Sequence, residues 1–260
     1  MTDKKYKIDN TWKELLNTNQ VDAVETVDGP VLVVAGAGSG KTRVLTYRYA
    51  HLVQKHNIDM DSILAITFTK KAAGEMKDRI SELLSLSSPP VWVTTFHSAC
   101  ARILRKHISR IGFNNSFSIY DSQDSVRLVS NCLKELDMDT KQYPPKRIHS
   151  QISMWKNKLI LPGEVIDEAS SFYETKIAEV YVKYEQKLIL ANSLDFDDLL
   201  IKTVELFNTD EDALLFWSKK FKYIMVDEYQ DTNFPQYKII ELLSREHKNI
   251  CVVGDSDQSI

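Results

Sequence analysis

The sequence is poor in the features that mark secreted and membrane proteins. It holds only three cysteines, Cys100, Cys132 and Cys251, and they lie far apart. No metal-binding spacing or disulfide framework follows from them, so we expect reduced and mostly buried thiols. The N-terminus lacks the apolar core of a signal peptide, and no apolar run approaches the length of a membrane span. We therefore expect a cytoplasmic protein.

A strong excess of charge is also missing. The formal net charge is −3, from 33 Lys and Arg against 36 Asp and Glu. A nucleic acid must then be bound by local basic patches rather than by an overall positive field. Hydrophobic residues (43%) and charged residues (27%) are as frequent as in ordinary globular proteins. At 260 residues, without repeats or low-complexity segments, the chain can form one large domain or two intermixed ones.

The first part of the chain alternates short apolar runs with helix-like segments. Val31–Val34, Ile63–Thr69 and Val91–Ser98 have the composition of strands, and the first is typical of a strand buried on both faces. Thr42–Val53 and Lys70–Leu84 follow two of these runs and have helical spacing. This alternation predicts an α/β fold, a parallel sheet with helices on both faces.

In the middle of the chain the alternation stops, and the sequence becomes helix-like, charged and aromatic. Strand-like runs resume at Lys222–Val226 and Asn249–Val253. The economical interpretation is one α/β domain formed by residues 1–104 and 194–260. A mostly helical insertion domain, residues 105–193, interrupts it.

The segment AGAGSGKT at Ala35–Thr42 indicates a phosphate-binding loop. Its small residues let the backbone wrap a polyphosphate, with Lys41 reaching the β and γ phosphates and the Thr42 hydroxyl ligating magnesium. The helix that follows directs its positive end at the same anion. The alternative is a chance glycine turn, which the strand before and the helix after disfavour. The loop residues are Ala35, Gly36, Ala37, Gly38, Ser39, Gly40, Lys41 and Thr42.

The segment VDEYQDT contains a pair of carboxylates, Asp227 and Glu228, which directly follow an apolar run. In a parallel sheet such a position lies beside the phosphate loop, because binding sites form at the carboxyl ends of the strands. We expect Asp227 to hold magnesium and Glu228 to orient and deprotonate the attacking water. The alternative is an exposed acidic loop. Together the two motifs indicate hydrolysis of a nucleoside triphosphate.

Two further polar positions are weaker signals. Asp255 and Gln258 follow another strand-like run and are placed to meet the γ-phosphate, although a simple polar turn explains them equally well. Gln20 offers a donor and an acceptor, which reading an adenine edge requires, but glutamine is also common on exposed helices.

Thr67–Thr69 and Thr95–His97 end two strands and raise the question of nucleic-acid binding. Hydroxyl groups there can hold a phosphate backbone, and an aromatic ring can stack on a base. The alternative for Phe68 and Phe96 is core packing. Basic residues nearby form either a local binding face or an ordinary solvated one. They are Lys70, Lys71, Lys77, Arg79, Arg102, Arg105, Lys106 and Arg110.

These motifs resemble, in order and over nearly the whole chain, the UvrD/Rep/PcrA-type superfamily 1 DNA helicases. The similar segments are LNTNQ, AGAGSGKTRVL, ILAITFTKKAAGEM, TFHS, LDFDDLL, VDEYQDTN and VVGDSDQSI. The resemblance implies a RecA-like P-loop NTPase domain (1A) carrying a helical insertion (1B). It also implies 3′ to 5′ translocation along single-stranded DNA, powered by ATP with Mg²⁺, and unwinding at single-strand/double-strand junctions in repair or replication.

The resemblance further implies roles for single residues. Gln20 contacts the adenine, and Arg43 lies near the nucleotide. Phosphate, metal and water are handled by Lys41, Thr42, Asp227, Glu228 and Gln258. The DNA path follows Thr67, Phe68, Thr69, Thr95 and His97, with Phe68 against the bases and Phe96 left to the core. Candidates for duplex contacts in the insertion, around Trp155, are Lys146, Arg147, Lys156 and Lys158.

One departure from the family concerns Ile260, beyond which family members continue into a second RecA-like half. That half supplies arginines to the γ-phosphate, so we expect a monomeric N-terminal fragment that binds Mg-ATP weakly, hydrolyses it little and does not unwind DNA alone. Two alternatives stay open: the motor portion of a helicase–nuclease, and a non-motor DNA-binding module switched by ATP. The motif set favours DNA over RNA, but no residue reads a 2′-hydroxyl explicitly, so an RNA substrate stays open as the less favoured alternative.

Overall fold

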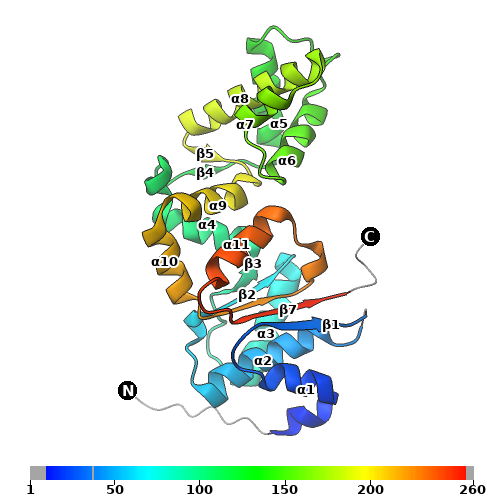
Figure 1. Cartoon of the computed structure of the whole chain (residues 1–260), viewed down its shortest axis with the longest axis vertical. Helices are drawn as coiled ribbons and strands as arrows, with labels where there is room; N and C mark the ends of the chain where they lie inside the picture. The colour runs from blue at the N-terminus through cyan, green and yellow to red at the C-terminus, as the bar shows by residue number, and fades with distance from the viewer. Residues whose placement is uncertain (1–9, 37, 256–260) are drawn as a thin grey trace. The chain divides into compact units, whose positions relative to one another are not determined.

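A computed structural model describes residues 10–36 and 38–255 (Figure 1). The chain forms two compact units. The sheet unit comprises the residues up to Ala99, Leu214–Thr232 and the residues from Ile240 onward; the helical unit comprises Cys100–Ala213 and Asn233–Ile239. The whole segment predicted as an insertion, residues 105–193, falls in the helical unit, and residues 194–213 belong to that unit too.

The sheet unit is built on five parallel strands in the order β1-β7-β6-β2-β3. They are β1 (Val31–Val34), β2 (Ile63–Thr67), β3 (Val93–Thr95), β6 (Tyr223–Val226) and β7 (Ile250–Gly254). Val33 pairs with Val253 at one side of the sheet, and Ala65 pairs with Val93 at the other. The predicted parallel sheet is confirmed, and the carboxyl ends of its strands lie along one edge.

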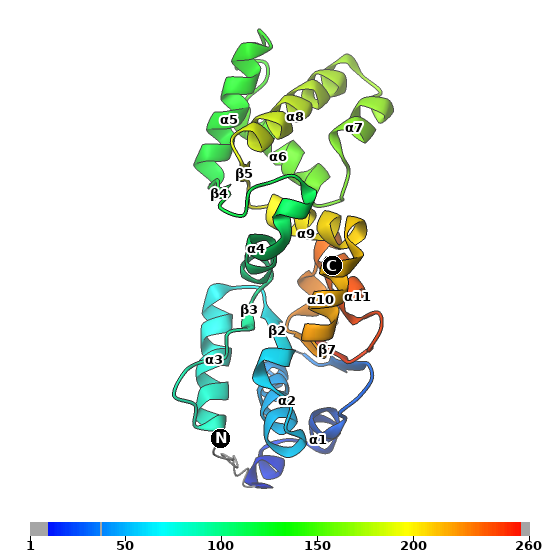
Figure 2. The same cartoon turned by 90° about the vertical axis from the view of Figure 1, so that its left-hand side faces the viewer.

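Helices flank this sheet, and their apolar faces form the core with it. The sheet unit contains η1 (Asn10–Leu15), α1 (Thr18–Glu25), α2 (Lys41–His56), η2 (Met60–Ser62), α3 (Lys70–Leu84) and η4 (Tyr229–Asp231). Figure 2 shows α2 and α3 side by side, and they are in contact. Tyr49 on α2, Met76 and Ile80 on α3, and Met225 on β6 are buried in one cluster. The α/β class with a flanked parallel sheet is thereby confirmed.

Three strands differ from their predictions by more than one residue or in burial, and one of them, β2, ends at Thr67 rather than at Thr69. β1 is one of the two edge strands of the described sheet, and its side chains alternate between half-buried and exposed, with Leu32 67% and Val34 56% exposed. The prediction that this run is buried on both faces is wrong, because the described residues do not cover the face that carries Leu32 and Val34. The predicted strand at Val91–Ser98 is shortened to β3, since α4 already begins at Phe96.

The helical unit contains a short parallel pair of strands and most of the remaining helices. The strands are β4 (Ser118–Ile119) and β5 (Ser193–Leu194). Its helices are η3 (Ile108–Ile111), α5 (Ser122–Glu135), α6 (Pro145–Lys156), α7 (Pro162–Glu168), α8 (Phe172–Leu190) and α9 (Asp198–Thr209). Three helices, α4 (Phe96–His107), α10 (Glu211–Lys220) and α11 (Phe234–Ser244), have residues in both units. Val129, Ile148 and Tyr184 belong to the core of the helical unit.

Lys156 contradicts the prediction that it is available for duplex contacts. Its side chain is 1% exposed, and its ammonium lies 2.7 Å from each of three carboxylates, those of Glu185, Asp195 and Asp198. Lys156 falls one helical turn after Ile152, on the face of α6 that packs into the core. Its place on the helix therefore buries it, and the carboxylates compensate its charge.

The other compositional predictions can be compared directly. Cys100, Cys132 and Cys251 are all buried and unpaired, as predicted. Within residues 10–36 and 38–255, no helix combines the length and the apolar character needed to cross a membrane.

Candidate active site

Three neighbouring strands deliver the predicted catalytic residues to the same edge of the sheet. β1 leads into the loop that ends at Lys41, β6 leads into Asp227 and Glu228, and β7 leads into Asp255. Because β7 lies between β1 and β6, the three turns at the carboxyl ends are adjacent. The sheet order thus brings together residues that are distant in the sequence.

The phosphate loop is shaped by glycines in the left-handed region. Gly38 has φ 73° and Gly40 has φ 92°, conformations that cost glycine little. Gly40 is the N-cap of α2, so the free N–H groups of the first turn of α2 begin where the loop ends. The Ser39 N–H donates to the Gly36 carbonyl across the loop, at 3.3 Å. A loop of this form, ahead of a helix N-terminus, suits an anion.

The Lys41 ammonium lies over the same loop. Its Nζ donates to the carbonyl oxygens of Ala35 (2.8 Å) and Gly36 (3.1 Å), and it lies 3.4 Å from Asp255 Oδ2. The residue is only 7% exposed. The ammonium is held mainly by neutral carbonyl oxygens, and it can exchange these contacts for charged phosphate oxygens.

Thr42 and Asp227 join the loop to the end of β6. The Thr42 hydroxyl donates to Asp227 Oδ2 at 2.8 Å, and the Asp227 N–H donates to the Ile66 carbonyl at 2.9 Å. Burial raises the pKa of Asp227, the hydrogen bond from Thr42 opposes this, and the charge of Glu228 adds to it. Two adjacent oxygen donors, one of them a buried carboxylate, fit the ligand preference of Mg²⁺.

Glu228 adopts the left-handed conformation, with φ 51° and ψ 48°, immediately before η4. Its Oε2 accepts a hydrogen bond from Gln230 Nε2 at 2.8 Å, and Gln230 Oε1 accepts one from the Asp255 N–H at 3.0 Å. A Cβ at Gly254 would lie 3.0 Å from that Gln230 oxygen, so glycine makes room for it. Sequence reasoning missed Gln230; its place two residues after the carboxylate pair was the available signal.

Gln20 reaches the phosphate loop from α1. Its Nε2 donates to the Ser39 carbonyl at 2.8 Å, while its Oε1 accepts from the Asn17 N–H at 3.0 Å. Asn17 in turn caps α1 by accepting from the Gln20 N–H, which completes a capping box. Both ends of the Gln20 amide are therefore engaged, and contact with a base would replace the bond to Ser39. Arg43 is exposed near the start of α2.

Buried Arg48 fixes α1 to α2 and thereby supports Gln20. It is 1% exposed, and its guanidinium donates to the carbonyls of Ala23 (2.7 Å), Thr26 and Val27 (3.1 Å) at the end of α1. Carbonyls at a helix C-terminus need partners from outside the helix, and here an arginine from α2 supplies them. Sequence reasoning did not single out Arg48, because one arginine among apolar residues of a helix gives no local signal.

The threonines predicted to meet DNA are engaged in local turns. The buried Thr67 hydroxyl donates to the Thr69 carbonyl at 3.1 Å, and the Thr69 hydroxyl caps α3 by accepting from the Ala72 N–H at 3.1 Å. The Thr95 hydroxyl donates to Ser98 Oγ at 3.0 Å. Thr69 is exposed, whereas Thr67 and Thr95 are buried.

The aromatic residues of these strand ends pack together. Phe68 is half-buried and meets Phe96 edge-on, with ring centroids 6.1 Å apart. Phe96 is 2% exposed, which confirms its prediction as a core residue. Burial lowers the pKa of His97 to about 4, so its imidazole is neutral at pH 7. Since β2 and β3 are neighbours, Thr67–Thr69 and Thr95–His97 lie along one edge of the sheet.

Two predicted site residues, Ala37 and Gln258, lie outside the described residues. All other predicted nucleotide-site residues belong to the sheet unit.

With this geometry established, comparison with known proteins places the chain. The model of the UvrD/REP helicase N-terminal domain matches residues 16–260. The chain belongs to this helicase family. That match covers the phosphate loop, the Asp227–Glu228 pair and both strand ends with Phe68 and His97.

Curated relatives are similar over almost the same region. The ATP-dependent DNA helicase PcrA of Bacillus subtilis (strain 168) is 49% identical over 245 residues, which are 94% of this chain and 33% of the relative. PcrA of Staphylococcus aureus (strain Mu50) is 45% identical, and PcrA of Staphylococcus epidermidis (strain ATCC 35984) is 46% identical; each match covers 94% of this chain and 34% of the relative. The chain thus spans about a third of the length of these relatives.

Proposed function

We propose that this chain forms the ATP-binding portion of a 3′ to 5′ DNA helicase, which uses ATP hydrolysis to move along single-stranded DNA and unwind duplex. The hydrogen bond between Thr42 and Asp227 carries the proposal, because it joins the phosphate loop to a buried carboxylate at the same edge of the sheet. The printed names of the relatives, ATP-dependent DNA helicases, support the same activity.

The phosphate loop binds the triphosphate of ATP in this proposal. Lys41 exchanges its contacts with the loop carbonyls for β and γ phosphate oxygens, and the N–H groups at the start of α2 donate to the same anion. Thr42 and Asp227 would hold Mg²⁺, which when bound offsets phosphate charge and orients the transferred group. In the same proposal Gln20 contacts the adenine, and Arg43 lies near the nucleotide.

Glu228 acts on the attacking water. Its carboxylate is held by Gln230, which also bonds the backbone of Asp255 at the end of β7. Gln230 therefore couples the position of the water-orienting group to the strand end that faces the γ-phosphate. Positioning of this kind, with charge stabilisation, supplies most of the catalysis in phosphoryl transfer.

Single-stranded DNA follows the strand ends at Thr67–Thr69 and Thr95–His97. Phe68 offers a half-buried ring for stacking on a base, and neutral His97 offers a hydrogen bond rather than a charge. Thr69 is the exposed hydroxyl of the group. The proposed substrate includes single-strand/double-strand junctions, the proposed assembly is a monomer, and the proposed processes are repair or replication.

The proposal is tested by titrating this chain with a fluorescent ATP analogue in the presence of Mg²⁺. Lys41→Ala should weaken binding at least about tenfold, since it removes a charged partner of the phosphates. Glu228→Gln should retain binding but lower single-turnover hydrolysis by about a hundredfold, the usual effect of losing a general base. Lys55→Ala, in the last turn of the same helix α2, is the matched control.

Two results would contradict this assignment. Equal affinities for Lys41→Ala and Lys55→Ala would place the nucleotide elsewhere. Unchanged single-turnover hydrolysis in Glu228→Gln would remove Glu228 from the reaction.

A further inference from the structure

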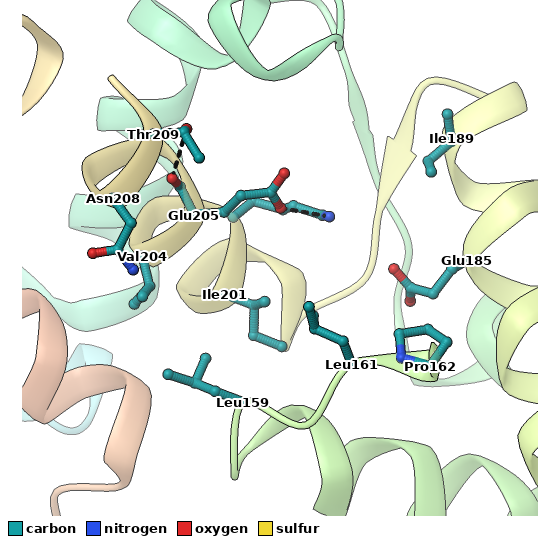
Figure 3. Close-up of a pocket in the computed structure, with 11 residues that line it drawn as sticks. Leu159, Leu161, Pro162, Glu185, Ile189, Ile201, Val204, Glu205, Asn208 and Thr209 are labelled. Carbon is teal, nitrogen blue, oxygen red and sulfur yellow. Dashed lines mark hydrogen bonds and ion pairs between the residues drawn. The ribbon is translucent and has the colours of Figure 1, made fainter. Parts of the chain in front are cut away.

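A pocket of about 570 Å³ opens within the helical unit, formed by its residues alone (Figure 3). The segment between α6 and α7, the end of α8 and the helix α9 surround it. Its lining consists of Leu159, Leu161, Pro162, Glu185, Ile189, Ile201, Lys202, Val204, Glu205, Asn208 and Thr209. The volume lies within the range of small-molecule sites in proteins.

The walls of the pocket are mainly aliphatic. Leu161 is 54% and Ile189 is 50% exposed, so both present apolar surface to solvent at the pocket. Leu159 has φ 58°, a left-handed conformation uncommon for leucine, and its N–H donates to the Lys156 carbonyl at 2.9 Å. An apolar ligand that covers these walls removes apolar surface from water, which favours binding.

Glu185 links this pocket to the buried charges of the helical unit. Its side chain is 16% exposed, and its Oε1 lies 2.7 Å from the ammonium of Lys156. In Figure 3, Glu185 stands beside Pro162, and Glu205 lies on α9. Lys202 pairs with Glu205 at 2.8 Å and lies 5.7 Å from the Phe113 ring, so its charge is already engaged.

Carboxyl groups outnumber cations in this cluster and its pocket. The two ammonium groups of Lys156 and Lys202 stand against the four carboxyl groups of Glu185, Asp195, Asp198 and Glu205. Burial, together with the charge of Asp195, raises the pKa of Asp198 well above its usual range. The excess of carboxyl groups over ammonium groups favours a positively charged ligand over a neutral or negative one.

We propose that the pocket binds a small organic cation with an apolar body, an alkylammonium or arylalkylammonium. The apolar body packs on Leu161, Ile189 and Ile201, and the ammonium donates hydrogen bonds to Glu185. The ligand thereby brings a positive charge to Glu185, which is the member of the group Lys156, Glu185, Asp195 and Asp198 that lines the pocket. This inference rests on the helical unit alone and is independent of the nucleotide site.

Isothermal titration calorimetry and ligand-observed NMR on the whole chain test the site with three probes of one shape. They are 4-phenylbutylamine, 4-phenylbutan-1-ol and 4-phenylbutanoate. The amine should bind at least about fivefold more tightly than the alcohol, and the carboxylate should bind most weakly, because the pocket carries excess negative charge.

Variants then locate the two halves of the ligand. Glu185→Gln should weaken the amine at least about fivefold and leave the alcohol unchanged, whereas Glu179→Gln, on the same helix α8 but outside the lining, should change neither. Leu161→Ala should weaken amine and alcohol alike, with Ile166→Ala, 45% exposed on α7 and outside the lining, as its control.

Three results would overturn the proposal: no probe binding at about 10 mM, equal affinities for amine and carboxylate, or equal effects of Leu161→Ala and Ile166→Ala. If Glu185→Gln fails to fold, the three probes on the unaltered chain and the two exposed apolar variants still decide the matter, because Leu161 and Ile166 are half-exposed.

Discussion

Polar side chains at the strand ends of the sheet unit either form hydrogen bonds between neighbouring turns or are buried in a neutral form. The Thr42 hydroxyl donates to Asp227, and Gln230 accepts from the Asp255 N–H, so these two bonds connect the turns that follow β1, β6 and β7. His97 is different, because burial keeps its ring neutral and lowers its pKa to about 4. A group whose folded and unfolded pKa values differ makes folding depend on pH, so His97 has a measurable thermodynamic effect.

We predict that His97 makes the protein less stable in mild acid. An exposed imidazole has a pKa of about 6.5, so the unfolded chain gains a proton at His97 before the folded chain does. The stability due to neutral His97 is complete above pH 6.5 and is lost progressively as the pH falls toward 4. Because the ring is partly exposed to solvent, we expect the free energy of unfolding to fall at pH 5 by an amount on the order of 1 kcal/mol.

Urea unfolding of the protein and of His97→Gln at pH 7.5 and pH 5.0 measures this effect. The loss of stability between the two pH values should be smaller in His97→Gln. The same substitution at His149, half-buried on α6, serves as control. If the free energy of unfolding fell by the same amount between pH 7.5 and pH 5.0 in His97→Gln and in the unaltered protein, His97 would accept its proton without penalty in the folded state.

At the scale of elements, caps and apolar spacing within a segment predicted the bounds of single helices. Lys70–Leu84 is helix α3 with the predicted bounds, because Thr69 caps it and Ala73, Met76 and Ile80 form a buried stripe. The exposed face of β1 was not predictable, since which face of a strand is covered depends on packing between distant segments. The position of the phosphate loop and of Asp227 at one edge of the sheet was predictable, because each directly follows an apolar, strand-like run in the sequence.

The burial of Lys156 was not predictable for a similar reason. A lysine one residue after Trp155 looks solvent-facing unless the partners of α6 are known, and its partners Asp195 and Asp198 come from the start of α9 and the residues just before it. Gln230 was missed although it lies two residues after Glu228, because its bond to Asp255 joins two strand ends that only the folded sheet brings together.

We predict that Lys156→Met strongly destabilises the helical unit. The substitution leaves three carboxylates without their shared cation, and breaking a buried ion pair at one partner costs about 3–5 kcal/mol. Lys158→Met, at a less buried position two residues later, should change stability by less than about 0.5 kcal/mol. Urea unfolding followed by far-UV circular dichroism compares the two variants, and similar midpoints would mean that the cluster adds nothing to stability.

For the whole molecule, the net charge does not favour DNA binding, whereas particular residues at one edge of the sheet do. A formal charge of −3 gives no general attraction for a polyanion, so binding must depend on a few residues. The sheet unit places Phe68 and His97 along one edge, at the ends of adjacent strands. The proposed DNA path therefore depends on residues of the sheet unit, and substituting one aromatic ring there should matter more than substituting an exposed ring in the helical unit.

We predict that Phe68→Ala weakens binding of a labelled oligothymidine, measured by fluorescence anisotropy at fixed low salt. Stacking of one base on an aromatic ring contributes about 1–3 kcal/mol, which corresponds to a loss of roughly 5- to 150-fold. Phe172→Ala is the control, because Phe172 is 74% exposed and belongs to the helical unit. Thermal unfolding of both variants separates loss of the Phe68–Phe96 contact from loss of DNA binding. If a folded Phe68→Ala bound the oligonucleotide as tightly as Phe172→Ala, the DNA would have to follow another part of the molecule.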